Sequence, residues 1–397
     1  MVPIAECCHS AATIYCDLPE TAYTLDPAQM AKSHKIRVAL LFGGQSAEHE
    51  ISILSARNVL AALDRSRFEP ILIGIDKEGR WLTQDAQKLL ASQSDPRLVR
   101  VQPGLPVQLS ASPSAPTQNP TVGQIDVVFP LMHGTLGEDG AIQGLLEVAG
   151  IPYVGAGVLG SAIGMDKDVM KRLLREAGVA VTEFRAVRDH EFLADPERTC
   201  REIAALGFPL FTKPANAGSS VGVRRVTSAA DLPGALRHAF QFDTKILAEA
   251  GVSGREIELA VLGGEPPTVS VAGEIIVEHS DGFYSYDAKY IDEHGAKLEA
   301  PARITADELA RAQQLALRAF QILECEGMAR VDLFLKTDGE LLVNEINTIP
   351  GFTAISMYPK LWTVSGVPPT ELVTRLIVLA LERGRKRLTI RRSFSSG

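Results

Sequence analysis

The apolar residues of this chain follow two patterns, one in each half of the sequence. In the first half, apolar runs at 36–42, 69–75, 126–132 and 152–154 alternate with stretches of helical periodicity after residues 46 and 140. Strands that alternate with helices predict a mainly parallel sheet with helices on its faces. The first half therefore indicates a Rossmann-like α/β domain.

The second half predicts longer strands with more antiparallel pairing, as in an α+β body. One helix is expected at 166–176, before Gly178. Another is expected to begin after Thr305, because Thr305 and Glu308 have the spacing of a capping box.

A hairpin near the C-terminus is the most informative local pattern. The run 328–336 alternates like a half-buried strand, Asp338-Gly339 is a strong turn signal, and 340–347 runs back. If those two residues form the turn, the register opposes Asp332 to Glu345 and Arg330 to Asn347 on one face.

Two opposed carboxylates repel each other when their Cβ atoms are about 4.5–5.5 Å apart. A divalent cation with oxygen ligands would compensate Asp332 and Glu345. The alternative is a solvated pair of acids on a sheet edge.

Composition excludes several classes of protein. With 397 residues, 46% of them hydrophobic and 22% charged, the chain is typical of a globular protein of two or three domains. A net charge of −8 argues against a nucleic-acid partner or an anionic membrane surface, and no apolar run reaches the about 18 residues of a membrane span. The odd count of 5 cysteines without metal-type spacing predicts free thiols in a reducing compartment.

Two stretches are expected to lie outside the core. Residues 1–34 show no clear period and have no Lys or Arg before Lys32, so we expect a disordered extension or a translation start upstream of Met30. Residues 102–122 are rich in Pro, Ser, Thr and Gln, which predicts a surface excursion.

Three stretches indicate a nucleotide, each with a simpler alternative. Gly155, Gly157 and Gly160 fit a dinucleotide fingerprint, but a glycine-rich linker explains them better, and a Walker A motif is absent. Lys213 enters a small-residue loop at 214–222 that can bind an anion or be a plain hairpin loop. Lys167 lies at a helix start, the positive end of the helix dipole, which is the less favourable end for a cation. A bound phosphate would explain a lysine there, and the alternative is a solvated lysine.

Other polar loops are candidates for a ligand crevice. His133 and Glu48 follow neighbouring predicted strands, where open α/β sheets bind ligands, although Ser46 and Asp139 can simply cap helices. The link at 247–256 can contact a purine and a ribose or be a turn. The aromatic stretch 282–290 can close as a lid or form an edge strand.

Taken together, these motifs resemble those of the D-alanine–D-alanine ligases, a family of the ATP-grasp superfamily. Agreement runs from about residue 36 to a helix expected to end near residue 382. Seven motifs occur in family order: GGQSAEH at 43–49, HGTLGEDG at 133–140, MDK at 165–167, GSS at 218–220, AKY at 288–290, RVD at 330–332, and EINTIPGFT at 345–353 with Ser356.

The resemblance implies a division of the chain and a fold. It implies ATP-grasp subdomains with ATP between antiparallel sheets. The expected segments are an extension at 1–34, the α/β domain at 35–155, a central ATP-grasp subdomain at 156–250, a catalytic ATP-grasp subdomain at 251–385 and a tail at 386–397.

The resemblance also implies how ATP is bound. Lys167, Lys213, Ser219 and Ser220 would hold phosphates, Glu249 and Val252 would meet adenine, and Glu256 would bind ribose. The ligands of two Mg²⁺ ions, for which Mn²⁺ is expected to substitute, would be Asp332, Glu345 and Asn347.

The implied reaction joins two D-alanine molecules through an acyl phosphate, for peptidoglycan precursor synthesis. Arg330 and the Gly351 N–H would stabilise the tetrahedral intermediate, and Glu48 would pair with the first ammonium, near His133. Lys289 and Ser356 would hold the second carboxylate. Ser219, Tyr290 and Glu48 would link through hydrogen bonds and latch the lid.

Three other functions are alternatives to this ligase. A D-alanine–D-lactate ligase would lack the Lys289-Tyr290 pair, a nicotinamide-dependent dehydrogenase would leave the paired acids without a role, and a non-catalytic ATP-binding protein would have lost Arg330, Asp332 or Asn347. The resemblance further implies a cytoplasmic homodimer, with no nucleic-acid or membrane partner.

Overall fold

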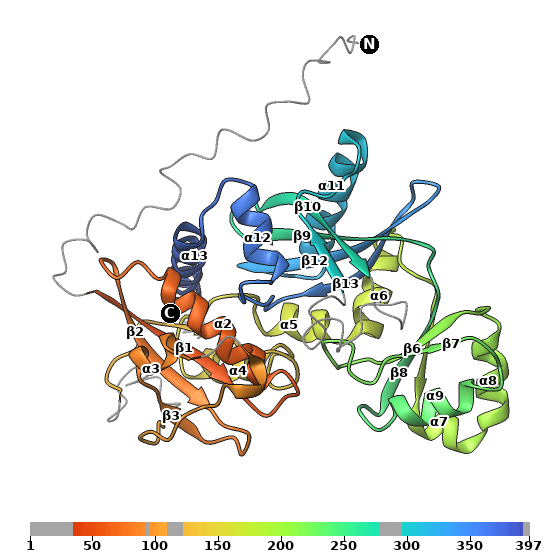
Figure 1. Ribbon diagram of the computed structural model, residues 1–397, viewed down its shortest axis with the longest axis horizontal. Helices are drawn as coiled ribbons and strands as arrows, with labels where there is room; N and C mark the ends of the chain where they lie inside the picture. Colours follow the sequence, from red (N-terminus) through yellow and green to blue (C-terminus); the bar gives the residue numbers. More distant parts are fainter. Residues whose placement is uncertain (1–34, 93–94, 109–121, 278–295, 392–397) are drawn as a thin grey trace, which may run out of the picture. The chain divides into compact units, whose positions relative to one another are not determined.

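Three β-sheets and the helices that cover them make up the described part of the chain (Figure 1). The computed structural model describes residues 35–92, 95–108, 122–277 and 296–391, all within one compact unit that begins at residue 35. The extension at 1–34, the aromatic stretch with Lys289 and Tyr290, and most of the excursion at 102–122 lie outside the described residues.

The first sheet is mainly parallel, as expected. Its order is β3-β2-β1-β4, and the strands are β1 (Ile36–Gly43), β2 (Phe68–Ile75), β3 (Trp81–Thr83) and β4 (Val127–Pro130). β1 pairs in parallel with β2 and with β4, whereas β3 is an antiparallel edge strand. Since β1 is buried on both faces, its apolar run is nearly continuous.

The helices around the first sheet follow its strands in sequence. They are α2 (His49–Ala62), α3 (Ala86–Leu90), the short 3₁₀ helix η2 (Pro96–Leu98) and α4 (Ala141–Val148). The strand expected at 152–154 is wrong, because Tyr153 makes only an isolated bridge with Val128.

The second sheet is antiparallel and has the order β5-β8-β6-β7. Its strands are β5 (Phe184–Arg188), β6 (Leu210–Pro214), β7 (Arg224–Val226) and β8 (Lys245–Ala250), with helices α7 (Asp189–Ala194), α8 (Pro196–Ala204) and α9 (Leu232–Ala239). β6 ends and β7 begins at either side of the small-residue loop, and β7 has only three residues.

The third sheet is antiparallel throughout and has the longest strands. Its order is β11-β10-β9-β12-β13, and the strands are β9 (Gly254–Leu262), β10 (Thr268–Val277), β11 (Ala296–Glu299), β12 (Met328–Lys336) and β13 (Leu341–Asn347). The antiparallel pairing expected for the second half is confirmed.

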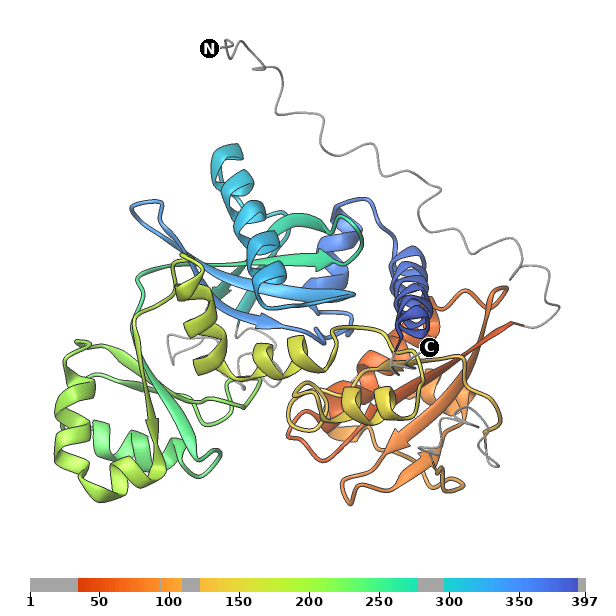
Figure 2. The same cartoon turned by 180° about the vertical axis from the view of Figure 1, so that it is seen from behind.

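Two helices pack on opposite faces of this third sheet, α11 (Ala306–Ile322) and α12 (Met357–Val364) (Figure 2). Alternation along β12 explains the arrangement: Ala329, Val331 and Leu333 are buried in the core that contains α11. Met328 faces the core that contains α12, so Arg330 and Asp332, which have the same parity, point to that side of the sheet.

Both helices predicted in the second half are confirmed, and α5 (Val158–Met165) precedes the first of them. α6 (Lys167–Glu176) has Asp166 as its N-cap, and α11 has the expected reciprocal capping box of Thr305 and Glu308. The last helix, α13 (Pro369–Thr389), extends beyond the end expected near residue 382.

No single helix in the described residues is long and apolar enough to cross a membrane. Only α12 and α13 taken together, across a bend of 107°, reach that length and composition.

The hairpin between β12 and β13 confirms the predicted partners but not the predicted turn. The two-residue Asp338-Gly339 turn is wrong: Lys336 and Glu340 close a three-residue loop in which Gly339 has φ +84°. A bulge at Asn344 then adds one residue to β13. The register therefore returns to Asp332 opposite Glu345 and Arg330 opposite Asn347.

Replacing the α11 cap tests the local basis of this fold. Thr305→Ala removes the oxygen that accepts the Glu308 N–H at 3.2 Å. We expect amide hydrogen exchange in the first turn of α11 to accelerate about fivefold, since a lost cap costs about 1 kcal/mol. Thr305→Ser keeps the oxygen and serves as the control. Equal exchange rates in the two variants would contradict the assignment.

Candidate active site

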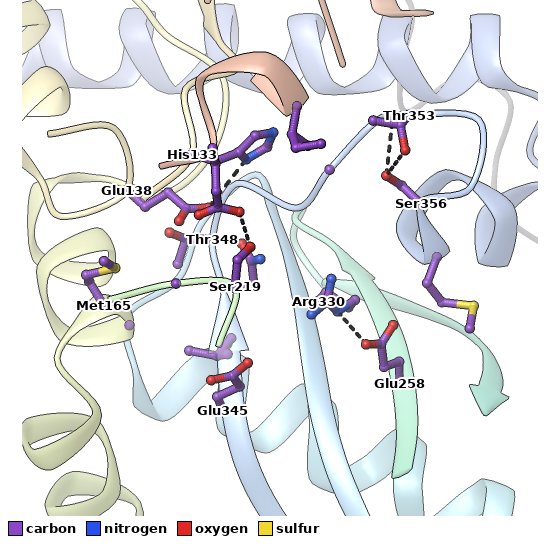
Figure 3. Close-up of a pocket in the computed structure, with 18 of the residues that line it drawn as sticks. His133, Glu138, Met165, Ser219, Glu258, Arg330, Glu345, Thr348, Thr353 and Ser356 are labelled. Atoms are coloured by element: carbon purple, nitrogen blue, oxygen red, sulfur yellow. Dashed lines mark hydrogen bonds and ion pairs between the residues drawn. The ribbon is translucent and has the colours of Figure 1, made fainter. Parts of the chain in front are cut away.

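A cavity lies between loops of the first sheet and the third sheet (Figure 3). Loops after β1 and β4 contribute Glu48 and His133, so these two residues share a crevice as predicted. The remaining predicted residues in its wall come from α6, the small-residue loop, the hairpin and the segment before α12: Lys167, Ser219, Arg330, Glu345, Asn347, Gly351 and Ser356.

The small-residue loop reaches this cavity through a hydrogen bond to the segment between β1 and α2. Ser219 Oγ donates to the Glu48 carboxylate, and Glu48 is buried. Ser219 and Ser220 have φ of +49° and +59°, a left-handed conformation that costs non-glycine residues on the order of 1–3 kcal/mol. Such strain at consecutive loop residues is typical of a ligand-binding loop.

His133, in the wall of the cavity, is held by contacts at both ring nitrogens. Its Nδ1 donates to the Ile349 carbonyl at 3.0 Å, and its Nε2 lies 3.2 Å from Ser55 Oγ. Burial opposes a charge on the ring, but the Glu138 carboxylate, 3.7 Å away, raises the pKa of His133. The Glu138 carboxyl is itself buried, which raises its pKa. The nearby Glu48 carboxylate also raises the pKa of His133.

A row of three carboxylates crosses the third sheet beside this cavity, and Glu258 and Glu345 of the row lie in the cavity wall. Asp332 on β12 pairs with Glu345 on β13 and with Glu258 on β9. Glu258 was missed in the sequence, because nothing local shows that β9 pairs with β12. The signal that could have found it is the spacing of two between Glu256 and Glu258, which places both on one face of a strand.

Two cations balance this row. Arg330 binds Asp332 through two hydrogen bonds of 2.7 and 2.6 Å and approaches Glu258 at 3.2 Å. Although burial works against its charge, Asp332 and Glu258 raise the pKa of Arg330 further above its usual value. Lys167 Nζ lies 3.7 Å from Glu345 Oε2 and donates to the Ala217 carbonyl at 2.8 Å.

The donor set on the hairpin fits a hard divalent cation. Asp332, Glu345 and Asn347 supply carboxylate and amide oxygens, and the bulge places Asn344 next to Glu345 in the wall of a second, adjoining cavity. Asn347 Oδ1 accepts the Ile349 N–H at 3.1 Å and keeps a second lone pair. Among the described residues, however, no cluster of three or more His, Cys, Asp or Glu side chains forms a ready-made metal site.

A second cavity adjoins the first and lies between the second and third sheets. Both share Lys167, Ser219 and Glu345 in their walls. The second cavity is also lined by the other residues predicted for a nucleotide, Lys213, Ser220, Glu249, Val252 and Glu256, and by the predicted metal ligand Asp332. Lys213 Nζ forms an ion pair of 2.7 Å with Glu249 Oε2.

Gly351 and Ser356 lie next to each other in the wall of the first cavity. Ser356 Oγ accepts the Thr353 N–H at 3.0 Å, and a Cβ added to Gly351 would lie 2.7 Å from that oxygen. A side chain at position 351 would therefore require the Ser356 hydroxyl to move.

The glycine-rich stretch around Gly155 does not line either of these cavities. A Cβ added to Gly160 would lie 2.4 Å from the Glu324 carbonyl, and one added to Gly157 would lie 2.9 Å from Glu326. These glycines serve close packing, which supports the linker interpretation over the dinucleotide fingerprint.

Family models match most of the chain. The family described as D-ala D-ala ligase N-terminus matches residues 37–156, and the one described as D-ala D-ala ligase C-terminus matches residues 173–378.

Named relatives and solved structures agree with these models. D-alanine--D-alanine ligase A of Chromobacterium violaceum is 52% identical over 366 residues, covering 90% of this chain and 99% of the relative, and that of Escherichia coli K12 is 50% identical, covering 88% and 96%. The structure of the D-alanine-D-alanine ligase from Coxiella burnetii has a TM-score of 0.78 at 37% identity, covering 89% of this chain and 96% of that one. The VanG D-Ala:D-Ser ligase from Enterococcus faecalis has a TM-score of 0.77 at 36% identity, covering 87% and 100%.

Removing Arg330 tests the charge balance of the carboxylate row. Arg330→Met deletes the cation that Asp332 and Glu258 share, and breaking a buried ion pair costs about 3–5 kcal/mol of unfolding free energy. We expect an earlier urea transition by Trp362 fluorescence in a Trp81→Phe background. Adding Glu258→Gln should recover part of the loss. A second variant as unstable as the first would contradict this balance.

Proposed function

The chain belongs to the D-alanine–D-alanine ligase family of ATP-dependent ligases, and we propose that its two adjoining cavities join two D-alanine molecules at the expense of ATP. The observation that carries the proposal is the wall shared by both cavities, at Lys167, Ser219 and Glu345. A nucleotide in one cavity can there meet an amino acid in the other.

ATP would occupy the cavity between the second and third sheets, as in an ATP-grasp fold. Lys167 and Lys213 would bind its phosphates together with the backbone of the Ser219-Ser220 loop. Glu249 and Val252 would meet the adenine, and Glu256 would bind the ribose. The placement of all these residues in one cavity or at its border supports the assignment.

Asp332, Glu345 and Asn347 would hold two Mg²⁺ ions, or Mn²⁺ in their place. Bound there, the ions would neutralise charge across the β- and γ-phosphate oxygens. Arg330 would then be released from its two hydrogen bonds to Asp332 and become available to the substrate.

The reaction would proceed in two steps. The carboxylate of the first D-alanine attacks the γ-phosphorus, which forms an acyl phosphate and releases ADP. The amine of the second D-alanine then attacks the acyl carbon, loses a proton and expels inorganic phosphate. Activation is needed because oxide is a poor leaving group from a carboxylate.

The chain's own side chains would orient both substrates. Glu48, near His133, would bind the first ammonium, while Arg330 and the Gly351 N–H would stabilise the oxyanion of the tetrahedral intermediate. Ser356 would bind the second carboxylate with Lys289. Ser219, Tyr290 and Glu48 would form the latch, of which the Ser219–Glu48 hydrogen bond lies within the described residues.

We further propose that the protein is a cytoplasmic homodimer that acts in peptidoglycan precursor synthesis. Exposed apolar side chains on the adjacent helices α4 and α5, namely Leu145, Val148 and Leu159, support self-association. Size-exclusion chromatography with light scattering would measure the mass directly.

D-alanine-dependent phosphate release in the presence of ATP and Mg²⁺ tests the function. We expect the dipeptide D-alanyl-D-alanine by mass spectrometry. Because a similar solved structure is a D-Ala:D-Ser ligase, D-serine and D-lactate should be offered in competition with D-alanine over pH 6–9. Predominant serine-containing or ester product at neutral pH would contradict the choice of second substrate. Tight NADH binding without phosphate release would contradict the enzyme class.

Glu345→Gln tests the cation assignment. We expect it to abolish phosphate release while leaving the fold intact, because an amide replaces the carboxylate charge shared by both cavities. Glu340→Gln, on the same hairpin and paired with Lys336, is the matched control and should remain active. Mn²⁺ binding in the presence of ADP, followed by paramagnetic resonance, should weaken only in the first variant. An active Glu345→Gln enzyme would refute the assignment.

A further inference from the structure

A buried lysine that the proposed reaction does not use lies behind the nucleotide cavity. Lys171 is on α6, one helical turn after Lys167, and its side chain is fully buried. Its Nζ lies 3.4 Å from Glu249 Oε1, and neither of these two atoms makes a hydrogen bond within the described part of the chain. The other oxygen of the same carboxylate binds Lys213 at 2.7 Å.

One buried carboxylate therefore faces two lysines. A buried charge is costly without a partner, and a single counter-ion is enough to neutralise Glu249. The two lysines differ in access: Lys213 is in the wall of the nucleotide cavity, whereas Lys171 is not. Of the two lysines, Lys213 can therefore leave Glu249 and bind a ligand in the cavity, whereas Lys171 cannot reach such a ligand.

We propose that Lys171 is a positioning residue that stays with Glu249 as its counter-ion while Lys213 leaves Glu249 for the nucleotide phosphates. The inference rests on the proposed function, because it takes ATP as the ligand of this cavity. Lys171 would keep Glu249 ionised and in place for the adenine. It would also release Lys213 for the phosphates.

The titration behaviour of the cluster agrees with this geometry. Burial opposes ionisation of Glu249, yet Lys171 and Lys213 together lower its pKa. Burial lowers the pKa of Lys171 to about 8, and the charge of Lys213 acts in the same direction, while Glu249 and Glu345 oppose it. Movement of Lys213 to a phosphate would remove that repulsion and strengthen the remaining pair.

A double-mutant cycle between Lys171 and Glu249 tests the inference. Lys171→Met removes the charge at similar length and leaves Lys213 as the only cation on Glu249. We expect the KM for ATP to rise about tenfold or more with kcat within about threefold, because Lys213 stays bound to Glu249. In a Glu249→Gln background the same substitution should change KM less than about twofold. Equal losses in both backgrounds, or no loss in the wild-type background, would overturn the inference.

The cycle remains informative if Lys171→Met alone does not fold. The double variant has no buried carboxylate to neutralise, and its KM for ATP should equal that of Glu249→Gln. A KM about tenfold higher would show that Lys171 acts independently of Glu249 and would overturn the inference. Failure of the proposed function is distinguishable, because the wild-type protein would then show no D-alanine-dependent phosphate release.

Discussion

Like charges held side by side on one sheet are the constraint around which this site is built. Glu258, Asp332 and Glu345 follow each other across β9, β12 and β13, and repulsion in such a row opposes strand pairing. The guanidinium of Arg330 and the ammonium of Lys167 offset that repulsion. Because both cations sit in the cavity walls, they can exchange these carboxylates for substrate groups when other cations arrive.

The hairpin shows how far local sequence carries a structural prediction. Alternation fixed which residues of β12 face the cavity, and the partners of Arg330 and Asp332 were predicted correctly. The turn was predicted wrongly. A two-residue type I′ turn needs a positive φ at both central residues, and of Asp338 and Gly339 only Gly339 has one. The bulge at Asn344 compensates for the extra loop residue, and no local signal in the sequence marks it.

Long-range pairing accounts for what the sequence could not reveal. The parallel first sheet, α6 and α11 follow from periodicity and capping, which are local properties. The position of β9 between β10 and β12 and the approach of Lys171 to Glu249 depend on residues far apart in the chain. The domain boundaries and the roles assigned to individual residues stay predictions.

The hydrogen bond between Ser219 and Glu48 joins residues 171 positions apart in the chain. It links the loop that borders the cavity assigned to the nucleotide with a residue of the cavity assigned to the amino acid. A ligand that competes for Glu48 must alter the free energy of the loop that borders the other cavity. By thermodynamic reciprocity, a ligand that orders this loop must change affinity at Glu48 by the same factor. The Ser219 hydroxyl therefore couples the binding of the two kinds of substrate, and this coupling can be positive or negative.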